Sequence, residues 1–275
     1  MMKSGRIILP ALAVLLTVGL FTACGRTAAD EPAALTPAAE EPAALTAPAG
    51  EPIVSTSPSP DWVVALGQAN RASQLFVVAG VGPTTATISL HETDADGNWR
   101  EILTTPGYIG KKGLGKTKEG DGMTPVGVFR FNAAFGIAAD PGCALPYHQV
   151  SDDDYWSGDV RDGYHYNEMV RLSDLPELDT AASEHLIDYT ANYQYCLNIS
   201  YNEDCVPGAG SAIFLHCLDA RKPYTGGCVA IPQQQMERVL QLVREDCVVV
   251  IDSLQKLSPE TWEQWGLPAA DAQSN

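Results

Sequence analysis

The sequence predicts a mainly β domain with a few helices, because short apolar runs separated by turn residues make up most of its middle. The run 85–90 alternates apolar and polar residues with period two, as a half-buried strand does. Asp96 and Gly97 separate this run from the next one at 99–103, and Asp-Gly between two apolar runs is typical of a β-hairpin. Helical spacing of apolar residues is rarer, so strands should dominate the fold.

Seven segments have the length and composition of strands. They are 74–79, 85–90, 99–103, 126–131, 193–200, 212–216 and 247–251. Two helices are expected, one over 180–189 and one over 232–245. In the second, apolar residues recur at helical spacing from Met236 to Val243, and Pro232 stands at a first-turn position.

Composition excludes several classes of function. The chain has 275 residues and a formal net charge of −17, and this length allows a sizeable core. A nucleic-acid-binding protein needs an excess of Lys and Arg to neutralise phosphates, so the acidic balance argues against one. It argues equally against a polybasic patch on anionic lipid. The 7 cysteines are too few for a disulfide-dense mini-domain. Cys196 and Cys205 are close enough in sequence to bridge locally, and the sequence leaves their pairing open.

The N-terminus has the features of an export signal. Lys3 and Arg6 precede the apolar run 7–21, which is shorter than the roughly 20 residues of a spanning helix. The run ends in small residues before Cys24 and resembles a bacterial lipobox, which implies removal of residues 1–23 and diacylation of the Cys24 thiol. Such an anchor would hold the protein on the outer face of the cell membrane, facing the cell wall. A plain signal peptide with an incidental cysteine is the alternative.

Residues 24–60 form an Ala/Pro/Glu-rich stretch, in which the hexapeptide at 31–36 recurs at 41–46. Frequent proline prevents a long helix, and little large apolar surface is available for a core. We expect a disordered tether, followed by a folded domain at 61–268 with its core at about 75–252, and a short tail at 269–275.

His216 and Cys228 are the residues that point to chemistry. His216 ends an expected strand, and Cys228 follows after a loop short enough to bring the two side chains together. An imidazole beside a thiol makes a cysteine nucleophile. Gly226 and Gly227 precede the cysteine, and their backbone N–H groups, with that of Cys228, could stabilise an oxyanion. Thr225, beside them, is a further candidate for the oxyanion site or for positioning.

These residues resemble the active-site signature of the L,D-transpeptidases, which carry a histidine, a loop and then Ser/Thr-x-Gly-Cys, here Thr225 to Cys228. The stretch Lys118-Glu-Gly-Asp121 and the later Thr124-Pro-x-Gly-x-Phe129 resemble a second motif of the same catalytic domain. The likeness covers roughly 75–252. We expect Lys116 and Thr124 of this second region, together with Tyr166 and Asn202, to contact substrate; for Tyr166 and Asn202, ordinary packing is the alternative.

The resemblance implies a β-rich, sandwich-like domain acting on peptidoglycan stem peptides. The Cys228 thiolate would attack the carbonyl after the third residue of a donor tetrapeptide and expel the terminal D-Ala. The amine of a second stem would then take the acyl group, giving a 3→3 cross-link, whereas water would give L,D-carboxypeptidase activity. His216 would move the proton. Neither metal nor cofactor is implied, because the donor peptide bond supplies the energy.

Two positions depart from the family pattern. Many members have His where this chain has Gly226, and Arg where it has Ala230. A catalytically inactive peptidoglycan-binding envelope lipoprotein is therefore the second hypothesis. A thiol redox protein is favoured only by the number of cysteines. A NlpC/P60-type peptidase would have its cysteine before its histidine, and a sortase would have its histidine much further upstream.

The stretch 110–117 also satisfies the P-loop pattern. A P-loop must open a helix, and Gly120, Gly122 and Pro125 follow too closely for one to form. We therefore expect no nucleotide, and instead a turn-rich loop that lines the active-site cleft.

Overall fold

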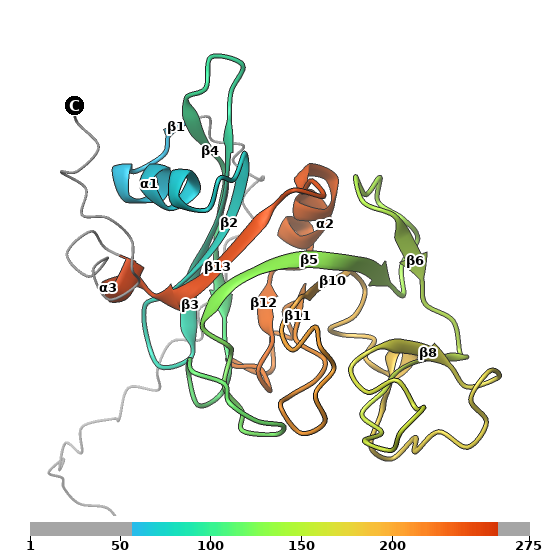
Figure 1. Cartoon of the computed structure of the whole chain (residues 1–275). Coiled ribbons are helices and arrows are strands. Elements are labelled where there is room, and N and C mark those ends of the chain that lie inside the picture. Colours follow the sequence, from blue (N-terminus) through green and yellow to red (C-terminus); the bar gives the residue numbers. More distant parts are fainter. Residues whose placement is uncertain (1–56, 258–275) are drawn as a thin grey trace, which may run out of the picture. The chain divides into compact units, whose positions relative to one another are not determined.

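The computed structural model describes residues 57–257, and Figure 1 shows how their elements are arranged. Ten strands form the main sheet: β1 (Ser57–Pro58), β2 (Gln74–Gly80), β3 (Thr85–Thr93), β4 (Trp99–Tyr108), β5 (Gly127–Gly136), β6 (Tyr147–Gln149), β10 (Cys196–Ile199), β11 (Phe214–Cys217), β12 (Val229–Ile231) and β13 (Val248–Ser253). All seven strands expected from the sequence are present. The β3–β4 hairpin turns at Gly97, whose φ of 83° is accessible to glycine without strain.

The main sheet closes on itself. Its strands follow the order β4-β12-β11-β10-β5-β13-β2-β3, and β3 pairs in turn with β4. β1 adds to the edge at β4, and β6 pairs with β5. Most neighbours are antiparallel, but β11 with β12, β13 with β2 and β5 with β6 are parallel. Closure leaves the enclosed face for a continuous apolar core.

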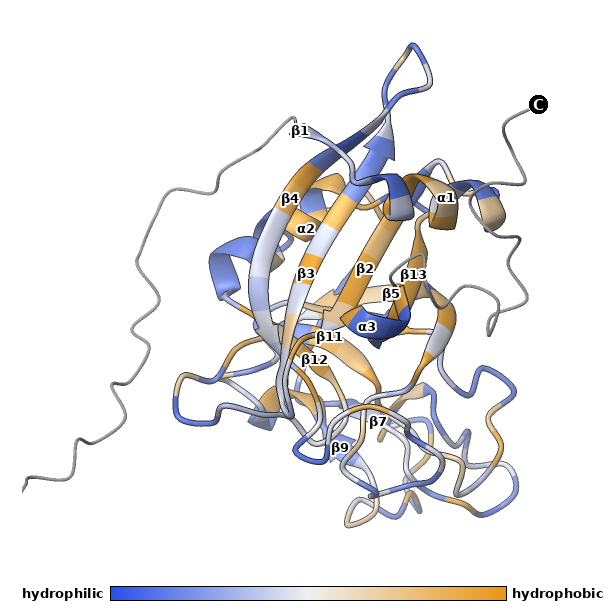
Figure 2. Ribbon diagram, turned by 90° about the vertical axis from the view of Figure 1, so that its left-hand side faces the viewer, coloured by the Kyte–Doolittle hydropathy of each residue, from blue (hydrophilic) through white to orange (hydrophobic). Residues whose placement is uncertain are grey.

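The two parallel strands β2 and β13 are apolar on both faces because each face meets a different layer. Phe76 and Val78 of β2 belong to the core enclosed by the sheet, whereas the alternating Leu75 and Val77 pack with Val63 of the first helix. Both strands are therefore hydrophobic over most of their length, while β3 and β4 alternate (Figure 2).

Helices lie on both faces of this sheet. α1 (Asp61–Ala69) and the short α3 (Leu254–Leu257) pack on the outer face with Leu75 and Val77, whereas α2 (Gln233–Leu242) packs on the enclosed core. The 3-10 turn η1 (Leu186–Asp188) packs in the aromatic cluster of Phe135. The predicted helix at 232–245 is confirmed by α2, which buries Met236, Val239 and Leu240. Within residues 57–257, no helix is long and apolar enough to cross a bilayer.

The helix predicted at 180–189 is wrong. This segment forms turns, then β9 (Glu184–His185), then η1. Asp179 accepts hydrogen bonds from the N–H groups of Ala181 and Ala182 and so favours turns at the start of the segment. Leu186 is fully buried against an aromatic cluster, and this tertiary contact decides the local conformation.

A second, three-stranded sheet has the order β8-β7-β9, with β7 (Asp154–Trp156) at its centre and β8 (Met169–Arg171) on one side. Trp156 of β7 stacks on Phe135 of β5 with ring centroids 5.9 Å apart and meets Phe214 of β11 edge-on at 4.8 Å. The resulting apolar cluster also contains Cys228. The small sheet thus packs directly behind the candidate nucleophile.

The signal peptide, Cys24, the tether up to residue 56 and the tail at 269–275 lie outside the described residues. Ser57 and Pro58 pair with β4, and the Ser59 hydroxyl bonds with Nδ1 of the buried His91 at 2.9 Å. Residues 57–59, just before the expected start of the folded domain at residue 61, therefore contact the main sheet.

Candidate active site

Parallel pairing of β11 with β12 brings His216 and Cys228 to one place. His216 lies in β11, Cys228 immediately precedes β12, and Leu215 is in register with Val229. Both side chains line one cavity of about 370 Å³, a size typical of small-molecule sites. The loop after β4 and the loop before β12 lie side by side at this end of the sheet (Figure 1), joined by a bridge between Gly110 and Thr225.

The Cys228 thiol is held in the uncharged state. Its Sγ–H donates to the Ala212 carbonyl at 3.2 Å, and the Phe214 N–H donates to Sγ at 3.4 Å. Burial and, to a smaller extent, the Glu184 carboxylate raise the pKa of Cys228 to about 12, against opposing effects of the Phe214 N–H and Lys116. The Phe214 N–H is the group already placed to stabilise a thiolate.

His216 is held as a neutral base. Its Nδ1 lies 2.8 Å from the Cys217 carbonyl oxygen, and because a carbonyl only accepts, Nδ1 carries the proton and Nε2 the lone pair. Burial lowers the pKa of His216 to about 4. The Tyr193 ring meets the imidazole edge-on at 5.6 Å. The Cys217 carbonyl is thus the third group that orients the histidine, which the sequence could not identify.

Thr225 closes the turn that presents the cysteine. Its Oγ1 donates to the Cys228 carbonyl at 2.6 Å and accepts from the Gly227 N–H at 3.1 Å. The Gly227 N–H therefore already has a partner, and in this conformation it does not serve as the oxyanion donor that the sequence suggested.

Gly227 is required for steric reasons instead. Its φ is 154°, and a Cβ there would lie 2.9 Å from the Met123 carbonyl oxygen. At Gly226, which lines the cavity, a Cβ would meet nothing within 4 Å. The backbone could therefore accept the side chain that many relatives carry at this position.

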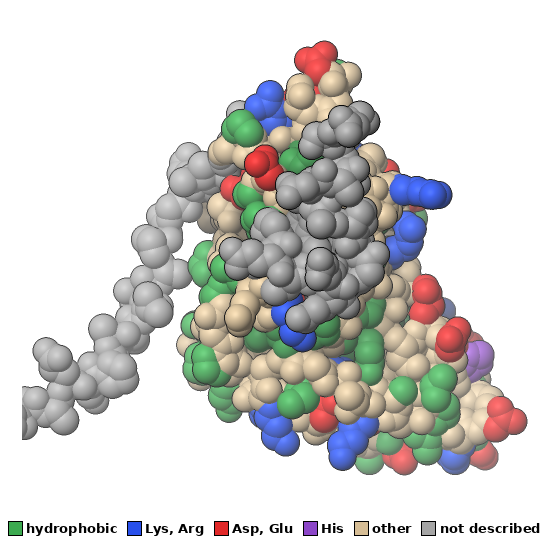
Figure 3. All heavy atoms as spheres, turned by 60° about the vertical axis from the view of Figure 1, so that its left-hand side comes forward, with side chains coloured by type: hydrophobic (Ala, Val, Ile, Leu, Met, Phe, Trp, Pro, Cys, Tyr) green, Lys and Arg blue, Asp and Glu red, His purple; other side chains and the backbone are tan. Residues whose placement is uncertain are grey.

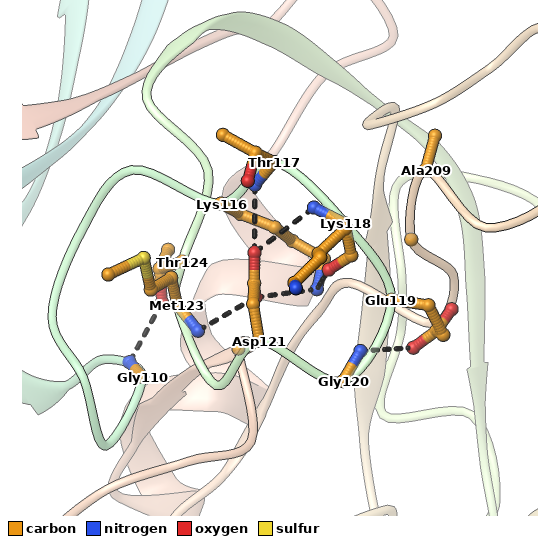
Figure 4. Close-up of polar contacts among 12 residues, drawn as sticks. Gly110, Lys116, Thr117, Lys118, Glu119, Gly120, Asp121, Met123, Thr124 and Ala209 are labelled. Atoms are coloured by element: carbon orange, nitrogen blue, oxygen red, sulfur yellow. Dashed lines mark hydrogen bonds and ion pairs between the residues drawn. The ribbon is translucent and has the colours of Figure 1, made fainter.

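The motif at 118–121 organises the loop beside the cavity (Figure 4). Burial raises the pKa of Asp121, but the N–H groups of Thr117, Met123 and Lys118 and the Lys116 ammonium outweigh it and lower the pKa to about 2. Lys116 Nζ lies 3.2 Å from Asp121 Oδ1, and only 2% of the Lys116 side chain is exposed. The stretch 110–117 contains turns and bridges but no helix, so it lacks the geometry of a P-loop.

Of the four side chains expected to contact substrate, Lys116 alone lines the cavity. Thr124 is fully buried and links the Gly110 N–H to the Cys228 carbonyl through its hydroxyl. The Tyr166 hydroxyl donates to Glu119 at 2.7 Å, and the Asn202 amide donates to backbone carbonyls of its own loop. Thr124, Tyr166 and Asn202 therefore hold the loops around the site and do not line this cavity, which for the last two favours the packing alternative.

Sequence reasoning missed Glu184. This residue of β9 lines the cavity and accepts a 2.6 Å hydrogen bond from the Tyr193 hydroxyl. Burial raises the pKa of Glu184 to about 7, with the Tyr193 hydrogen bond opposing and the Glu119 carboxylate adding to the rise. No local pattern marks it, because the segment around it reads as a helix.

Asn167 acts as a positioning residue, a role that the sequence did not indicate. Its Oδ1 accepts from the Ala212 N–H at 3.0 Å and from Trp156 Nε1 at 3.1 Å. It thereby fixes Ala212, whose φ is 54° and whose carbonyl holds the thiol.

Within residues 57–257, no group of three or more His, Cys, Asp or Glu side chains is arranged to hold a metal ion. The six cysteines of this part of the chain are all free thiols, so the local Cys196–Cys205 bridge does not form. The arrangement is a buried thiol and a neutral imidazole, with a tautomer fixed by a carbonyl, at the wall of one cavity. A thiol and a base placed in this way have the groups that nucleophilic chemistry through sulfur requires.

Comparison with known families agrees with this class. Residues 94–251, more than half of the chain, match the model of the L,D-transpeptidase catalytic domain, YkuD, and the chain belongs to this family. The resemblance found in the sequence is thereby confirmed. The family acts on the peptides of peptidoglycan.

Among solved structures, the chain is similar to the helical cell shape determining protein Pgp2 from Campylobacter jejuni, with 17% identity and a TM-score of 0.37. The match covers 70% of this chain and 54% of that chain, so this protein spans about half the length of Pgp2. A comparison with curated proteins gave no match.

Proposed function

We propose that this protein is an L,D-transpeptidase that forms 3→3 cross-links between peptidoglycan stem peptides through a thioacyl-enzyme on Cys228. The observation that carries the proposal is the placement of Cys228 and His216 on one cavity, with Nε2 of His216 left as the free base by the Nδ1–Cys217 hydrogen bond.

In the first half-reaction, Nε2 of His216 takes the Sγ proton of Cys228 as sulfur attacks the carbonyl carbon after the third residue of the donor. The thiol must first leave its hydrogen bond to the Ala212 carbonyl. The tetrahedral intermediate then collapses. The C–N bond breaks, the departing D-Ala amine receives the proton from Nε2, and a thioester remains on Cys228.

In the second half-reaction, the side-chain amine of another stem attacks the thioester and gives its proton to Nε2. Sulfur leaves and recovers that proton, and the new amide is the cross-link. Water attacking in place of the amine gives a free carboxylate, which is the carboxypeptidase outcome.

The resting pair is neutral, which constrains the timing of these steps. The pKa of Cys228 is raised to about 12 by burial and that of His216 is lowered to about 4 by burial. A preformed thiolate–imidazolium pair is therefore unfavourable in the empty cavity. Proton transfer and sulfur attack should be coupled and should depend on bound substrate.

An inactive peptidoglycan-binding protein is the second candidate. Three observations favour it: the uncharged Gly226 and Ala230 at positions where many relatives carry His and Arg, and the engagement of the Gly227 N–H by Thr225. Against it stands the fixed tautomer of His216, which a binding protein does not need.

We also propose that the protein is exported and anchored through a lipid on Cys24, facing the cell wall. The basic start, the apolar run and the small residues before Cys24 support this. Mass analysis of the protein isolated from membranes would detect the acyl groups, and a Cys24→Ala variant should be released into the soluble fraction.

The test of activity is product analysis. The full chain in mild detergent is incubated with purified disaccharide-tetrapeptide, and products are followed by mass spectrometry, with Cys228→Ala alongside. A cross-linked dimer absent from the variant would support transpeptidation, and tripeptide alone would support hydrolysis. If neither product forms while the protein binds the muropeptide, the binding-protein alternative is favoured.

A further inference from the structure

Lysine is concentrated around the active-site cavity of this acidic protein. The lysines of the described residues stand at positions 111, 112, 116, 118, 222 and 256. All except Lys256 lie in the two loops 109–126 and 218–227 that border the cavity. On the face drawn in Figure 3, by contrast, charged side chains of both signs are interspersed. With a net charge of −17, such a cluster suggests an anionic ligand at the cavity.

Three of these lysines line the cavity, and they differ in what they are bound to. Lys116 is buried and committed to Asp121. Lys111 and Lys222 are exposed residues that line the cavity, and neither has an ion pair within the described range 57–257. Asp219, the carboxylate closest to Lys222 in sequence, is held by Arg221 through two contacts of 2.9 Å. Two ammonium groups thus remain available to a ligand.

The backbone brings these two lysines to the cavity from opposite loops. The Lys111 N–H donates to the Thr225 carbonyl at 2.9 Å, three residues before the nucleophile. The Lys222 N–H donates to the Asp219 carbonyl at 3.0 Å, within the turn that follows β11. Glu119 and Glu184 line the cavity as well and also border a smaller adjoining cavity with Trp156. Asp219 also lines the cavity, on the loop of Lys222, but its carboxylate is paired with Arg221. The cavity therefore has Glu119 and Glu184 where it adjoins that smaller space, and free ammonium groups on the two loops.

We propose that Lys111 and Lys222 form a carboxylate-binding subsite that takes the C-terminal carboxylate of the donor stem peptide. The inference rests on the proposed function and adds the feature by which the donor is selected. The bond that Cys228 attacks is one residue from the donor's C-terminus, so its terminal carboxylate lies close to sulfur during attack. Two lysine ammonium groups neutralise it and orient the scissile carbonyl. Ala230, which also lines the cavity, contributes no charge.

The test compares two synthetic donor tetrapeptides, one with a free terminal carboxylate and one with a terminal carboxamide. Release of the terminal residue by the full chain in detergent is measured as kcat/KM. We expect a preference for the carboxylate of about 5-fold for each lysine, as exposed charge-assisted contacts provide. The Lys111→Gln, Lys222→Gln double variant should lose the preference, because its kcat/KM falls for the carboxylate peptide to about the value for the carboxamide peptide.

Lys112→Gln is the matched control, because Lys112 is the exposed neighbour of Lys111 and does not line the cavity. It should keep the full preference, which separates local contact from the general charge of the loop. Lys111→Arg should retain most of it.

Equal kcat/KM for the two peptides in the unaltered protein would overturn the inference, as would an equal loss in Lys112→Gln. Binding of both peptides to Cys228→Ala separates this failure from failure of the proposed function. If nothing is turned over but the carboxylate peptide still binds more tightly in a lysine-dependent way, the subsite stands and the catalytic proposal fails.

Discussion

Removal of the Thr225 hydroxyl tests how the nucleophile is positioned. Thr225 is buried, and its Oγ1 is engaged in two hydrogen bonds, to the Cys228 carbonyl at 2.6 Å and from the Gly227 N–H at 3.1 Å. Thr225→Val keeps the shape of the side chain and removes both. The Cys228 carbonyl keeps the Thr124 hydroxyl as a partner at 3.2 Å, but the Gly227 N–H is left without one.

The magnitude follows from these two losses. A lost hydrogen bond with a remaining partner costs about 1 kcal/mol, and a buried unpaired N–H costs about 1–3 kcal/mol. The free energy of unfolding should therefore fall by about 2–4 kcal/mol. Because the turn also aims Cys228, turnover should fall further than the loss of folded protein explains.

Urea unfolding of the full chain measures the first quantity, and the rate of release of the terminal residue from the donor peptide measures the second. Thr225→Ser keeps the hydroxyl and should lie within about 1 kcal/mol of the unaltered protein. A Thr225→Val variant that is as stable and as active as Thr225→Ser would refute the role assigned to this hydroxyl.

Three further predictions concern the walls of the cavity. Gly227→Ala should lower the free energy of unfolding by about 1–3 kcal/mol, because Gly227 has a positive φ and the Met123 carbonyl lies close to the added Cβ. Gly226→Ala has open space at its Cβ and should change the free energy of unfolding by less than about 0.5 kcal/mol. Similar values for the two variants would contradict the steric argument. Alkylation of Cys228 by iodoacetamide, followed by peptide mapping, should be slow at pH 7 and still rising above pH 9, because burial raises the thiol pKa to about 12; a plateau below pH 8 would show a preformed thiolate. Glu184→Gln should accelerate that alkylation at pH 9, since the Glu184 carboxylate raises the thiol pKa.

Glu184 also makes stability depend on pH in a direction that can be worked out. Its folded-state pKa is raised from 4.5 to about 7 by burial, so the folded protein holds a proton that the unfolded chain releases. Stability contributed by this group is present below pH 4.5 and is lost as pH rises to about 7, by about 2–3 kcal/mol after allowance for its partial exposure. Because Glu184→Gln lacks this titration, its free energy of unfolding in urea, relative to that of the unaltered protein, should rise by that amount between pH 4.5 and pH 8. Parallel stability curves for the two proteins would contradict the raised pKa.

Local sequence patterns were sufficient for the regular parts of the fold. The β3–β4 hairpin follows from alternation and from the Asp96-Gly97 turn, and α2 follows from its apolar spacing and Pro232. The helix α1 was not predicted, because it comes directly after a stretch rich in Pro and Ala and is held by tertiary burial of Val63 and Leu66. The wrong helix at 180–189 has the same cause, since the burial of Leu186 is not visible locally.

In the candidate site, too, residues marked by a local pattern could be predicted and residues brought in by tertiary structure could not. Cys228 and His216 could be found because their residue types, spacing and loop glycines form a local pattern. Glu184 and Asn167 could not, because they reach the site from β9 and from the segment before β8, far away in the chain. The Cys217 carbonyl is a backbone group, and no residue type signals its role.

The central claim is that Cys228 carries the acyl group, and trapping of that intermediate tests it most directly. The full chain in detergent is mixed with disaccharide-tetrapeptide, quenched in acid and analysed by intact mass and peptide mapping. The account predicts a thioester adduct, equal in mass to the donor without its terminal D-Ala, on the peptide that contains Cys228, and none in Cys228→Ala. An adduct on another cysteine, or release of D-Ala that persists in Cys228→Ala, would contradict it.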